Sequence, residues 1–244
     1  MKKILFTFMA LFAIMLTVSA QTMKVYQNGQ LKAIYYVSKE DQVEFSEDFP
    51  FPDDNKYNGH EYVDLGLSVK WATMNVGATS PEGYGYYFAW GETQPKSTYD
   101  LSTYFDSVDG SDSNFNKYCM GKKATLAPED DAAHVNWGGD WRMPKIDEMD
   151  ELRDNCTWTW TTQNGVNGYK VTSKKNGNSI FLPAAGDRYD NSLVQVGSRG
   201  IYWSSSLFRA DASLAHSLDF ESDFADTMFA NFRSDGYSVR AVCP

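Results

Sequence analysis

The chain has 244 residues with a formal net charge of −10, and 15% of its residues are aromatic. Such a negative field repels the phosphates of nucleic acids and of anionic lipids, so both are poor partners. The aromatic content fits two interpretations equally well: a β-rich surface that binds sugars or proteins, or a β-rich core with many half-buried rings.

The first twenty residues have the three-part form of a secretory signal peptide. Lys2 and Lys3 precede an apolar run over residues 4–18, and small residues stand before the expected cleavage point after Ala20. The apolar run is short for a membrane span. We expect export to the periplasm, the cell surface or the extracellular space, with no membrane span in the mature chain. Cleavage removes two of the 22 basic residues and none of the 32 acidic ones, which gives a mature net charge of −12.

Residues 21–48 predict a small β-hairpin extension. Asn28-Gly29 separates two β-prone runs within residues 22–36, and both residues of the tightest hairpin turns must take a positive φ. A third short strand at residues 43–45 is expected to add to this hairpin. Residues 49–58 contain two prolines and two adjacent aspartates without periodicity, which indicates a linker to a main domain at 59–244.

The main domain combines short strands, long loops and one clear helix, which predicts an α+β fold. The helix is expected over residues 144–155, with Pro144 at its first position, where a missing N–H costs nothing. Residues 80–113 lack a helical repeat and predict a long irregular span of the kind that often carries function. Strands are expected at residues 62–72, 158–161, 169–172, 179–182, 201–203, 215–220, 228–232 and 238–242.

Two groups of tryptophans stand out along the domain. Trp158 and Trp160 alternate with threonines, so both rings point to one face of a strand. They suit either a sugar-stacking platform or a cover for the core, and the core is favoured because two exposed indoles promote aggregation. Residues 137–143 predict a second buried group, in which Gly138-Gly139 allow a tight backbone path and Arg142 is held by a carboxylate or by carbonyls. Its expected core residues are Trp137, Trp141 and Met143.

Seven short sequence blocks occur in a fixed order through residues 60–243. They read YVDLGL at 62–67, WAT with NVGA at 71–78, AWGET at 89–93, DDAAH with WRMP at 130–144, FLPAAG at 181–186, YWSSS at 202–206, and SVR with a following valine at 238–242. In these blocks the chain resembles the Fibrobacter succinogenes major paralogous domain family, which is common in exported proteins of gut and rumen Bacteroidota. The resemblance implies a C-type-lectin-like fold with short strands, long loops and at least one helix.

The same resemblance links the chain to formylglycine-generating enzymes, which share that fold. The segment RMPKIDEMD at 142–150 echoes their helix motif. Those enzymes bind copper through a close pair of cysteines near the C-terminus, and here Cys243 has no such neighbour. Calcium-dependent lectins read sugars with Glu-Pro-Asn or Gln-Pro-Asp together with Trp-Asn-Asp. This chain has QPK at 94–96, with a lysine where the second carboxylate should be, and no Trp-Asn-Asp. We therefore expect no enzyme activity and no cofactor, with structural calcium as an open alternative.

Three cysteines follow the predicted signal peptide, and no two of them form a C-x-x-C pair. They are Cys119, Cys156 and Cys243. Export permits one disulfide and one free thiol, and the spacing does not say which two pair. C-type-lectin-like domains join their helix to their last strand, so the resemblance implies a Cys156–Cys243 bridge. The alternative is two buried thiols.

Several polar groups are candidates for chemical sites. Asp130, Asp131 and His134 share a helical face, but a metal site needs more ligands, so caps of a helix start are favoured. The acids at 219, 221, 223 and 226 predict a solvated face. The serines at 204–206 lack the surroundings of a nucleophile. His216 lies in a predicted strand and is expected to be a packed or surface residue.

The polar loop at 186–200 is the expected ligand surface, because its mixture of residues is typical of adaptable recognition surfaces. The candidate binding residues are Arg188, Tyr189, Asn191, Gln195 and Arg199. In C-type-lectin-like folds late loops of this kind build the binding face. The sequence thus favours an exported, non-catalytic binding or adhesion module for a protein or glycan. The alternatives are a divergent enzyme related to formylglycine-generating enzymes, and a structural subunit of a surface assembly that pairs through the 22–36 hairpin.

Overall fold

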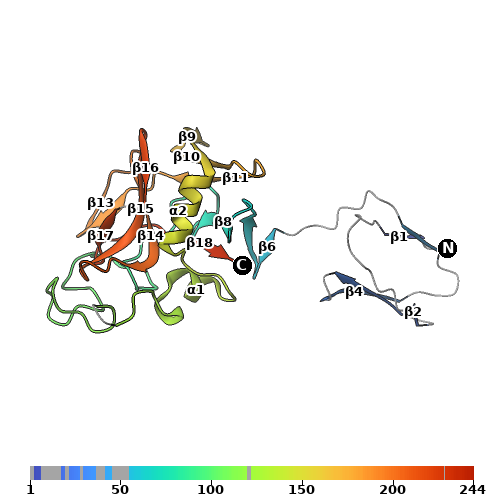
Figure 1. The fold of residues 1–244 in the computed structure, drawn as a ribbon, viewed down its shortest axis with the longest axis horizontal. Coiled ribbons are helices and arrows are strands. Elements are labelled where there is room, and N and C mark those ends of the chain that lie inside the picture. Colours follow the sequence, from blue (N-terminus) through green and yellow to red (C-terminus); the bar gives the residue numbers. More distant parts are fainter. Residues whose placement is uncertain are drawn as a thin grey trace. The chain divides into compact units, whose positions relative to one another are not determined.

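A computed structural model describes residues 55–119, 122–227 and 229–244 in full, and the backbone of five strands nearer the N-terminus (Figure 1). The chain divides into two compact units, residues 1–53 and 54–244. The five strands of the first unit are β1 (Lys3–Phe6), β2 (Val18–Ser19), β3 (Thr22–Gln27), β4 (Gln30–Tyr36) and β5 (Gln42–Phe45).

Within the first unit, β3 and β4 form the predicted antiparallel hairpin, with Thr22 opposite Tyr36. The turn residues Asn28-Gly29 lie outside the described residues. The expectation that residues 43–45 join this hairpin is wrong. Strand β2 occupies the outer edge of β3, and β5 satisfies its backbone groups in a parallel pair with β1.

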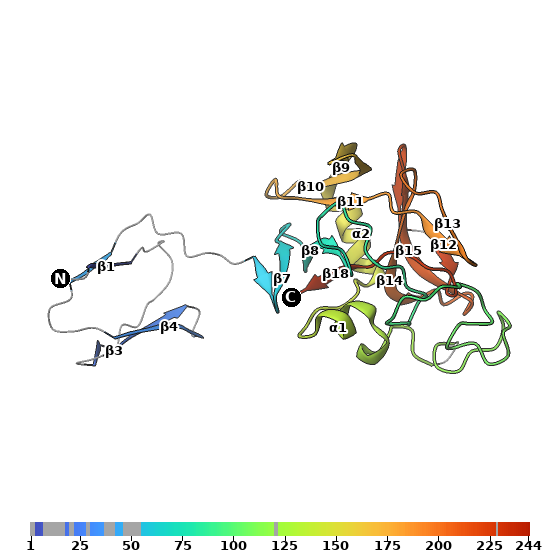
Figure 2. The same ribbon diagram turned by 180° about the vertical axis from the view of Figure 1, so that it is seen from behind.

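The second unit is an α+β domain made mostly of β-sheet (Figures 1 and 2). Its helical elements are a 3₁₀ turn η1 (Pro128–Asp130) and the helices α1 (Ala132–Trp137) and α2 (Ile146–Asn155). Its strands are β6 (Lys56–Tyr57), β7 (His60–Val63), β8 (Lys70–Asn75), β9 (Cys156–Gln163), β10 (Val166–Ser173), β11 (Ser179–Pro183), β12 (Asp187–Tyr189), β13 (Ser192–Val194), β14 (Gly200–Leu207), β15 (Leu214–Glu221), β16 (Phe224–Asp226), β17 (Ala230–Phe232) and β18 (Arg240–Cys243). In the part of the chain that the structure describes, no helix is long and apolar enough to cross a membrane.

Four sheets build this domain. Their strand orders are β18-β8-β7-β6, β11-β10-β9, β14-β15-β16 with β17 also on β15, and β12-β13. Strand β6 falls inside the predicted linker 49–58, which therefore ends earlier than the sequence indicated, because Lys56–Tyr57 pair with β7. The last strand, β18, pairs with β8 near the start of the domain, as the red and cyan strands beside the C-terminus show in Figure 1.

Arg240 on β18 fixes this closure from inside the core, where it is fully buried. Its guanidinium donates to Asn75 Oδ1 at 2.9 Å, to the Ala72 and Thr73 carbonyls at 3.1 and 3.2 Å, and to the Phe181 carbonyl at 2.9 Å. Burial lowers the pKa of Arg240 to about 10. The charge is thus held by amide and carbonyl dipoles, which bind β18, β8 and β11 together.

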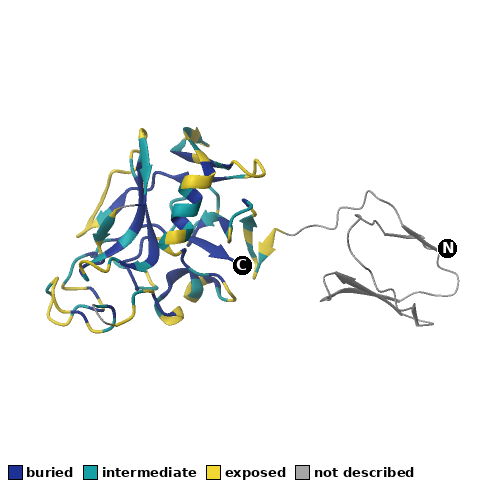
Figure 3. Ribbon diagram, viewed as in Figure 1, coloured by how far each residue is buried: buried dark blue, intermediate teal, exposed yellow. Residues whose placement is uncertain are grey.

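The core has two large aromatic clusters. The predicted core residues Trp137, Trp141 and Met143 all belong to the first, and Trp141 is fully buried with its Nε1 donating to the Tyr57 carbonyl at 2.7 Å. Helix α2 buries Met149 and Leu152 in the second. In Figure 3 the dark blue of buried residues also runs along most of β14, β15 and β18.

Helix α2 begins at Ile146, so Pro144 is not its first residue as predicted. The Lys145 N–H donates to Glu148 Oε2 at 2.8 Å, and the Ile146 N–H donates to Ser206 Oγ at 3.1 Å. The Pro144 carbonyl instead accepts from the Ser205 N–H at 2.7 Å, which ties the chain before the helix to β14. Arg142 is held by a carboxylate as expected, because it donates twice to Glu148, at 2.7 and 2.5 Å.

The irregular span at 80–113 is confirmed, since it holds only isolated bridges. It wraps around Arg233, which is fully buried and forms an ion pair with Asp106. The Arg233 Nε donates to the Tyr104 hydroxyl at 3.0 Å, and its guanidinium lies 4.9 Å from the centre of the Trp90 ring. Because removing either partner of a buried ion pair is costly, this pair fixes the path of the span.

The implied Cys156–Cys243 disulfide is absent, and both residues are buried thiols, as the alternative held. Successive residues of a strand point to opposite faces. On β18, Val242 faces the cluster that contains Cys156, so Cys243 faces the other cluster. Burial raises the pKa of both thiols to about 11.

Candidate functional site

The predicted ligand loop folds as a β-hairpin, in which β12 and β13 pair antiparallel beside β15 (Figure 2). Every residue from 189 to 196 is exposed. The chain enters through Gly186, where φ is +67° and a Cβ atom would lie 2.1 Å from the Val194 carbonyl oxygen. Only glycine fits this position, so the hairpin leaves the domain along a defined path.

Arg199 holds the base of the hairpin. Its Nε donates to Asp219 Oδ1 at 2.8 Å, and a second nitrogen pairs with the other carboxylate oxygen. Asp219 on β15 is fully buried, so the prediction of a solvated acidic face is wrong at this position. The arginine also donates to Gln195 Oε1 at 3.1 Å. Since a bidentate arginine–carboxylate pair fixes both partners, Arg199 is an anchor of the binding loop.

Arg188 is a second anchor. Its backbone exchanges two hydrogen bonds with Gly236, at 2.9 and 2.8 Å, and its guanidinium lies 5.4 Å from the centre of the Tyr87 ring. The turn is held as well, because Asp190 and Tyr99 exchange backbone hydrogen bonds at 2.9 and 3.0 Å. The hairpin is therefore tied to the domain at its base, middle and turn.

The exposed residues of the hairpin include both apolar and polar side chains. The exposed fraction is 58% for Tyr189, and 40%, 40% and 42% for Leu193, Val194 and Val196. Asn191 accepts from the Thr98 hydroxyl at 2.7 Å and is exposed. We call residues 189–196 the hairpin surface. Of the five residues singled out from the sequence, it contains Tyr189, Asn191 and Gln195, whereas Arg188 and Arg199 fix it from behind.

An acidic group lies next to this surface. Arg188 pairs with Gly236, so Asp187 and Tyr189 share a face with Asp235 and Tyr237. Burial raises the pKa of Asp235 to about 6, although the Tyr237 hydroxyl donates to it at 3.1 Å. Burial also raises the pKa of Asp187, whose Oδ1 has no hydrogen-bond partner among the described residues.

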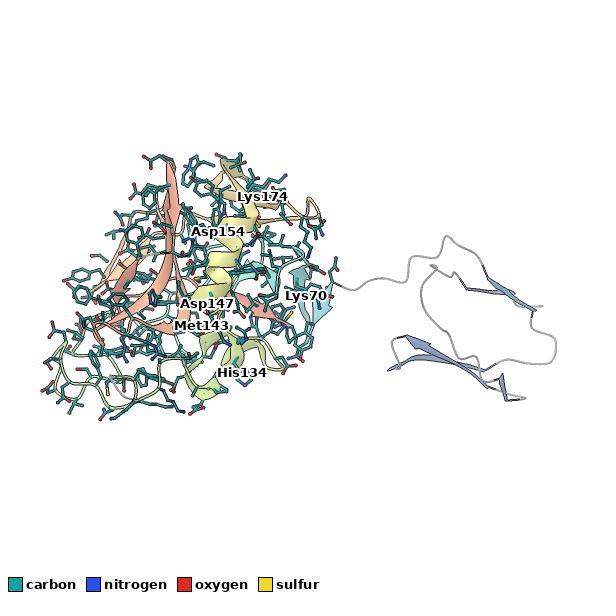
Figure 4. The ribbon with its side chains drawn as sticks, in the orientation of Figure 1. Lys70, His134, Met143, Asp147, Asp154 and Lys174 are labelled. Carbon is teal, nitrogen blue, oxygen red and sulfur yellow. The ribbon has the colours of Figure 1, made fainter. Side chains whose placement is uncertain are left out.

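The residues weighed as metal ligands have structural roles. Asp131 caps α1 by accepting the His134 N–H at 3.0 Å, and it also accepts the Met143 N–H at 2.9 Å. Asp130 instead accepts from Lys117 and Tyr118, each at 2.5 Å. Figure 4 shows Met143 and His134 below the first turn of α2. The capping interpretation is confirmed for Asp131, whereas Asp130 binds side chains instead of a helix cap.

The other candidates are also packed into the fold. The hydroxyls of Ser204 and Ser205 donate to the carbonyls of His216 and Pro144, at 2.7 and 3.3 Å. The ring of His216 meets that of Phe208 at 5.2 Å, and burial lowers its pKa. Trp158 and Trp160 are half-buried on the second core cluster, each with its ring edge-on to Tyr169, which confirms the core interpretation.

A cleft of about 300 Å³ was not expected from the sequence. It lies between β7–β8 and the β9–β11 sheet. Its lining residues are Val63, Thr73, Pro81, Gln163, Lys170, Ser179, Ile180 and Phe181. They come from six separate segments, so only the folded arrangement brings them together.

Comparisons of the chain with protein-family models, with curated proteins and with solved structures find no match. The family resemblance therefore stays a prediction from the sequence blocks. Function has to be argued from the hairpin surface and the cleft.

Proposed function

We propose that residues 54–244 form a non-catalytic binding module on a C-type-lectin-like scaffold, exported from the cell, which binds a protein through the hairpin surface. The mostly-sheet α+β domain with its long irregular span is compatible with that scaffold. N-terminal sequencing of the exported protein tests whether residues 1–20 are removed as a signal peptide. A chain that starts at Gln21 supports export, and a soluble cytoplasmic pool that keeps Met1 contradicts it.

The observation that carries the proposal is a rigidly anchored surface with exposed apolar residues. Eight consecutive residues are exposed, although Arg199 and Asp219 fix the hairpin base through a bidentate ion pair. Exposing Tyr189 and Leu193 costs free energy that a solvated loop would avoid. A preorganised aromatic and aliphatic group also loses little conformational entropy on binding, which favours a protein partner over a purely polar one.

The test compares three forms of the domain in pull-downs from the native cell surface and on a glycan array. The hairpin variant is Tyr189→Ser with Leu193→Ser, and the control is Val108→Ser, which changes an equally exposed apolar residue elsewhere. A partner retained by wild type and control is then purified, and its Kd is measured with all three. We expect the hairpin variant to raise the Kd at least tenfold, with an unchanged melting temperature.

Single substitutions of the chemical candidates separate binding from catalysis. Cys119→Ser, His134→Ala and His216→Ala are each expected to leave the Kd for that partner unchanged in folded protein. A Kd that is insensitive to the hairpin variant would refute the proposed surface. Copper-dependent oxidation of a peptide cysteine, or any turnover lost in one of these three variants, would favour the enzyme alternative.

A further inference from the structure

The cleft between β7–β8 and the β9–β11 sheet carries polar groups without partners. Lys170 Nζ and Ser179 Oγ make no hydrogen bond or ion pair with any residue that the structure describes. Gln163 uses only its amide nitrogen, in a long 3.4 Å bond to Glu82, which leaves its carbonyl oxygen open. One cation, one hydroxyl and one amide oxygen thus line the same small space.

A buried positive charge lies behind the cleft. Arg240 donates to the carbonyls of Thr73 and Phe181, and both of these residues line the cleft. Its other partners are the Asn75 side chain and the Ala72 carbonyl, so no carboxylate among the described residues pairs with it. In a medium of low dielectric such a charge acts over several ångströms, and it favours an anion in front of the cleft wall.

Two acids near the cleft have partners other than Lys170. Glu82 accepts from Asn164 at 2.9 Å as well as from Gln163, and these hydrogen bonds lower its pKa. Glu61 pairs with Lys56 at 3.4 Å. Lys170, on the exposed face of β10 opposite Phe181, therefore keeps its ammonium for a ligand, on a chain whose net charge is −10.

Apolar residues complete the lining, namely Val63, Pro81, Ile180 and Phe181. A volume of about 300 Å³ is at the lower end of small-molecule pockets. Apolar walls suit the C–H faces of a sugar ring, and scattered polar groups suit its hydroxyls. Phosphate usually requires an arginine fork or a cluster of backbone N–H groups, whereas this lining offers a single ammonium.

We propose that this cleft binds a uronic acid, a monosaccharide unit that carries a carboxylate. Lys170 would receive the carboxylate, and Gln163 and Ser179 would bind hydroxyls. This site is distinct from the hairpin surface and does not depend on the function proposed for it.

The test measures binding of D-glucuronate and D-galacturonate to the full chain by NMR titration. Matched probes are D-glucose and D-galactose without the carboxylate, and acetate and inorganic phosphate without the sugar. We expect at least one uronate to bind tenfold or more tightly than its neutral sugar and than both simple anions. Lys170→Met is expected to weaken it at least tenfold, because a charge-assisted hydrogen bond is lost, and added salt to weaken it further.

Three further variants separate recognition of the sugar from a general effect of charge. Lys123→Met removes an exposed lysine outside the cleft and is expected to leave uronate affinity within twofold of wild type. Gln163→Leu is expected to weaken uronate binding at least threefold and to leave acetate binding unchanged. Tyr189→Ser on the hairpin surface is expected to have no effect. The proposal is overturned if neither uronate binds, if acetate or phosphate binds equally well, or if Lys170→Met matches Lys123→Met.

Discussion

Asp131 offers the sharpest test of how the domain is held together. It accepts the N–H of His134 at the start of α1 and the N–H of Met143 before α2, so one carboxylate joins two elements. Asp131→Ala removes a helix cap, which is worth about 1 kcal/mol. It also leaves the buried Met143 N–H without a partner, which costs about 1–3 kcal/mol. We expect the free energy of unfolding to fall by about 2–4 kcal/mol.

Asp131→Asn separates the hydrogen bonds from the charge. With its amide oxygen in the place of Oδ1 it can still accept the His134 N–H, but its NH2 group replaces the Oδ2 acceptor of the Met143 N–H. It also carries no charge into the core, where burial raises the pKa of Asp131. The free energy of unfolding of Asp131→Asn is expected to fall by about half as much as that of Asp131→Ala. Urea denaturation followed by tryptophan fluorescence gives both values, with exposed Asp112→Ala as the unchanged control. An alanine variant within about 0.5 kcal/mol of wild type, or an asparagine variant that is worse than alanine, would refute this account.

Two further predictions concern a core tryptophan and an acidic residue beside the hairpin surface. Trp141→Ala should lower the free energy of unfolding by about 3–5 kcal/mol through cavity formation, and an unaltered melting transition would contradict its core role. For Asp235, a folded-state pKa of about 6 lies above the unfolded value, so the folded state holds the extra proton. Stability from this group is therefore present below about pH 4 and is lost as the pH rises through about 6. Asp235→Asn keeps an acceptor for Tyr237 and should remove this pH dependence. If the free energies of unfolding of this variant and wild type differ by the same amount at pH 4.5 and at pH 7, the prediction is contradicted.

The parts of the fold that were predictable from sequence depend on local patterns. Met149 and Leu152 recur at helical spacing and bury one face of α2, and the alternation of Trp158 with Trp160 correctly placed both rings on one face of β9. Chain-local signals of this kind do not report partners far away in sequence. Asp219 looks like part of a solvated acidic run because its partner, Arg199, lies 20 residues earlier, in the loop before β14.

For the candidate site, too, some features could be predicted from the sequence and others could not. Its polar composition drew attention to residues 186–200, but composition cannot separate an exposed side chain such as Tyr189 from an anchor such as Arg188. The apolar exposure of Leu193 and Val194 was equally invisible, because β-prone residues usually indicate a core. The cleft could not be predicted at all, since its lining comes from segments between Val63 and Phe181 that meet only after folding.

The pairing of β8 with β18 has a consequence for the order of events during synthesis. Lys70 Nζ donates to the Pro244 carbonyl, across 174 positions of the chain. The strand that completes this sheet, β18, thus follows the domain's other strands in the sequence, and Arg240 cannot join Ala72 to Phe181 before it is made. Contacts so distant in sequence slow folding. We therefore expect this sheet to stay open in a nascent chain until β18 has been made, which leaves aromatic side chains such as Trp71 accessible to chaperones until then.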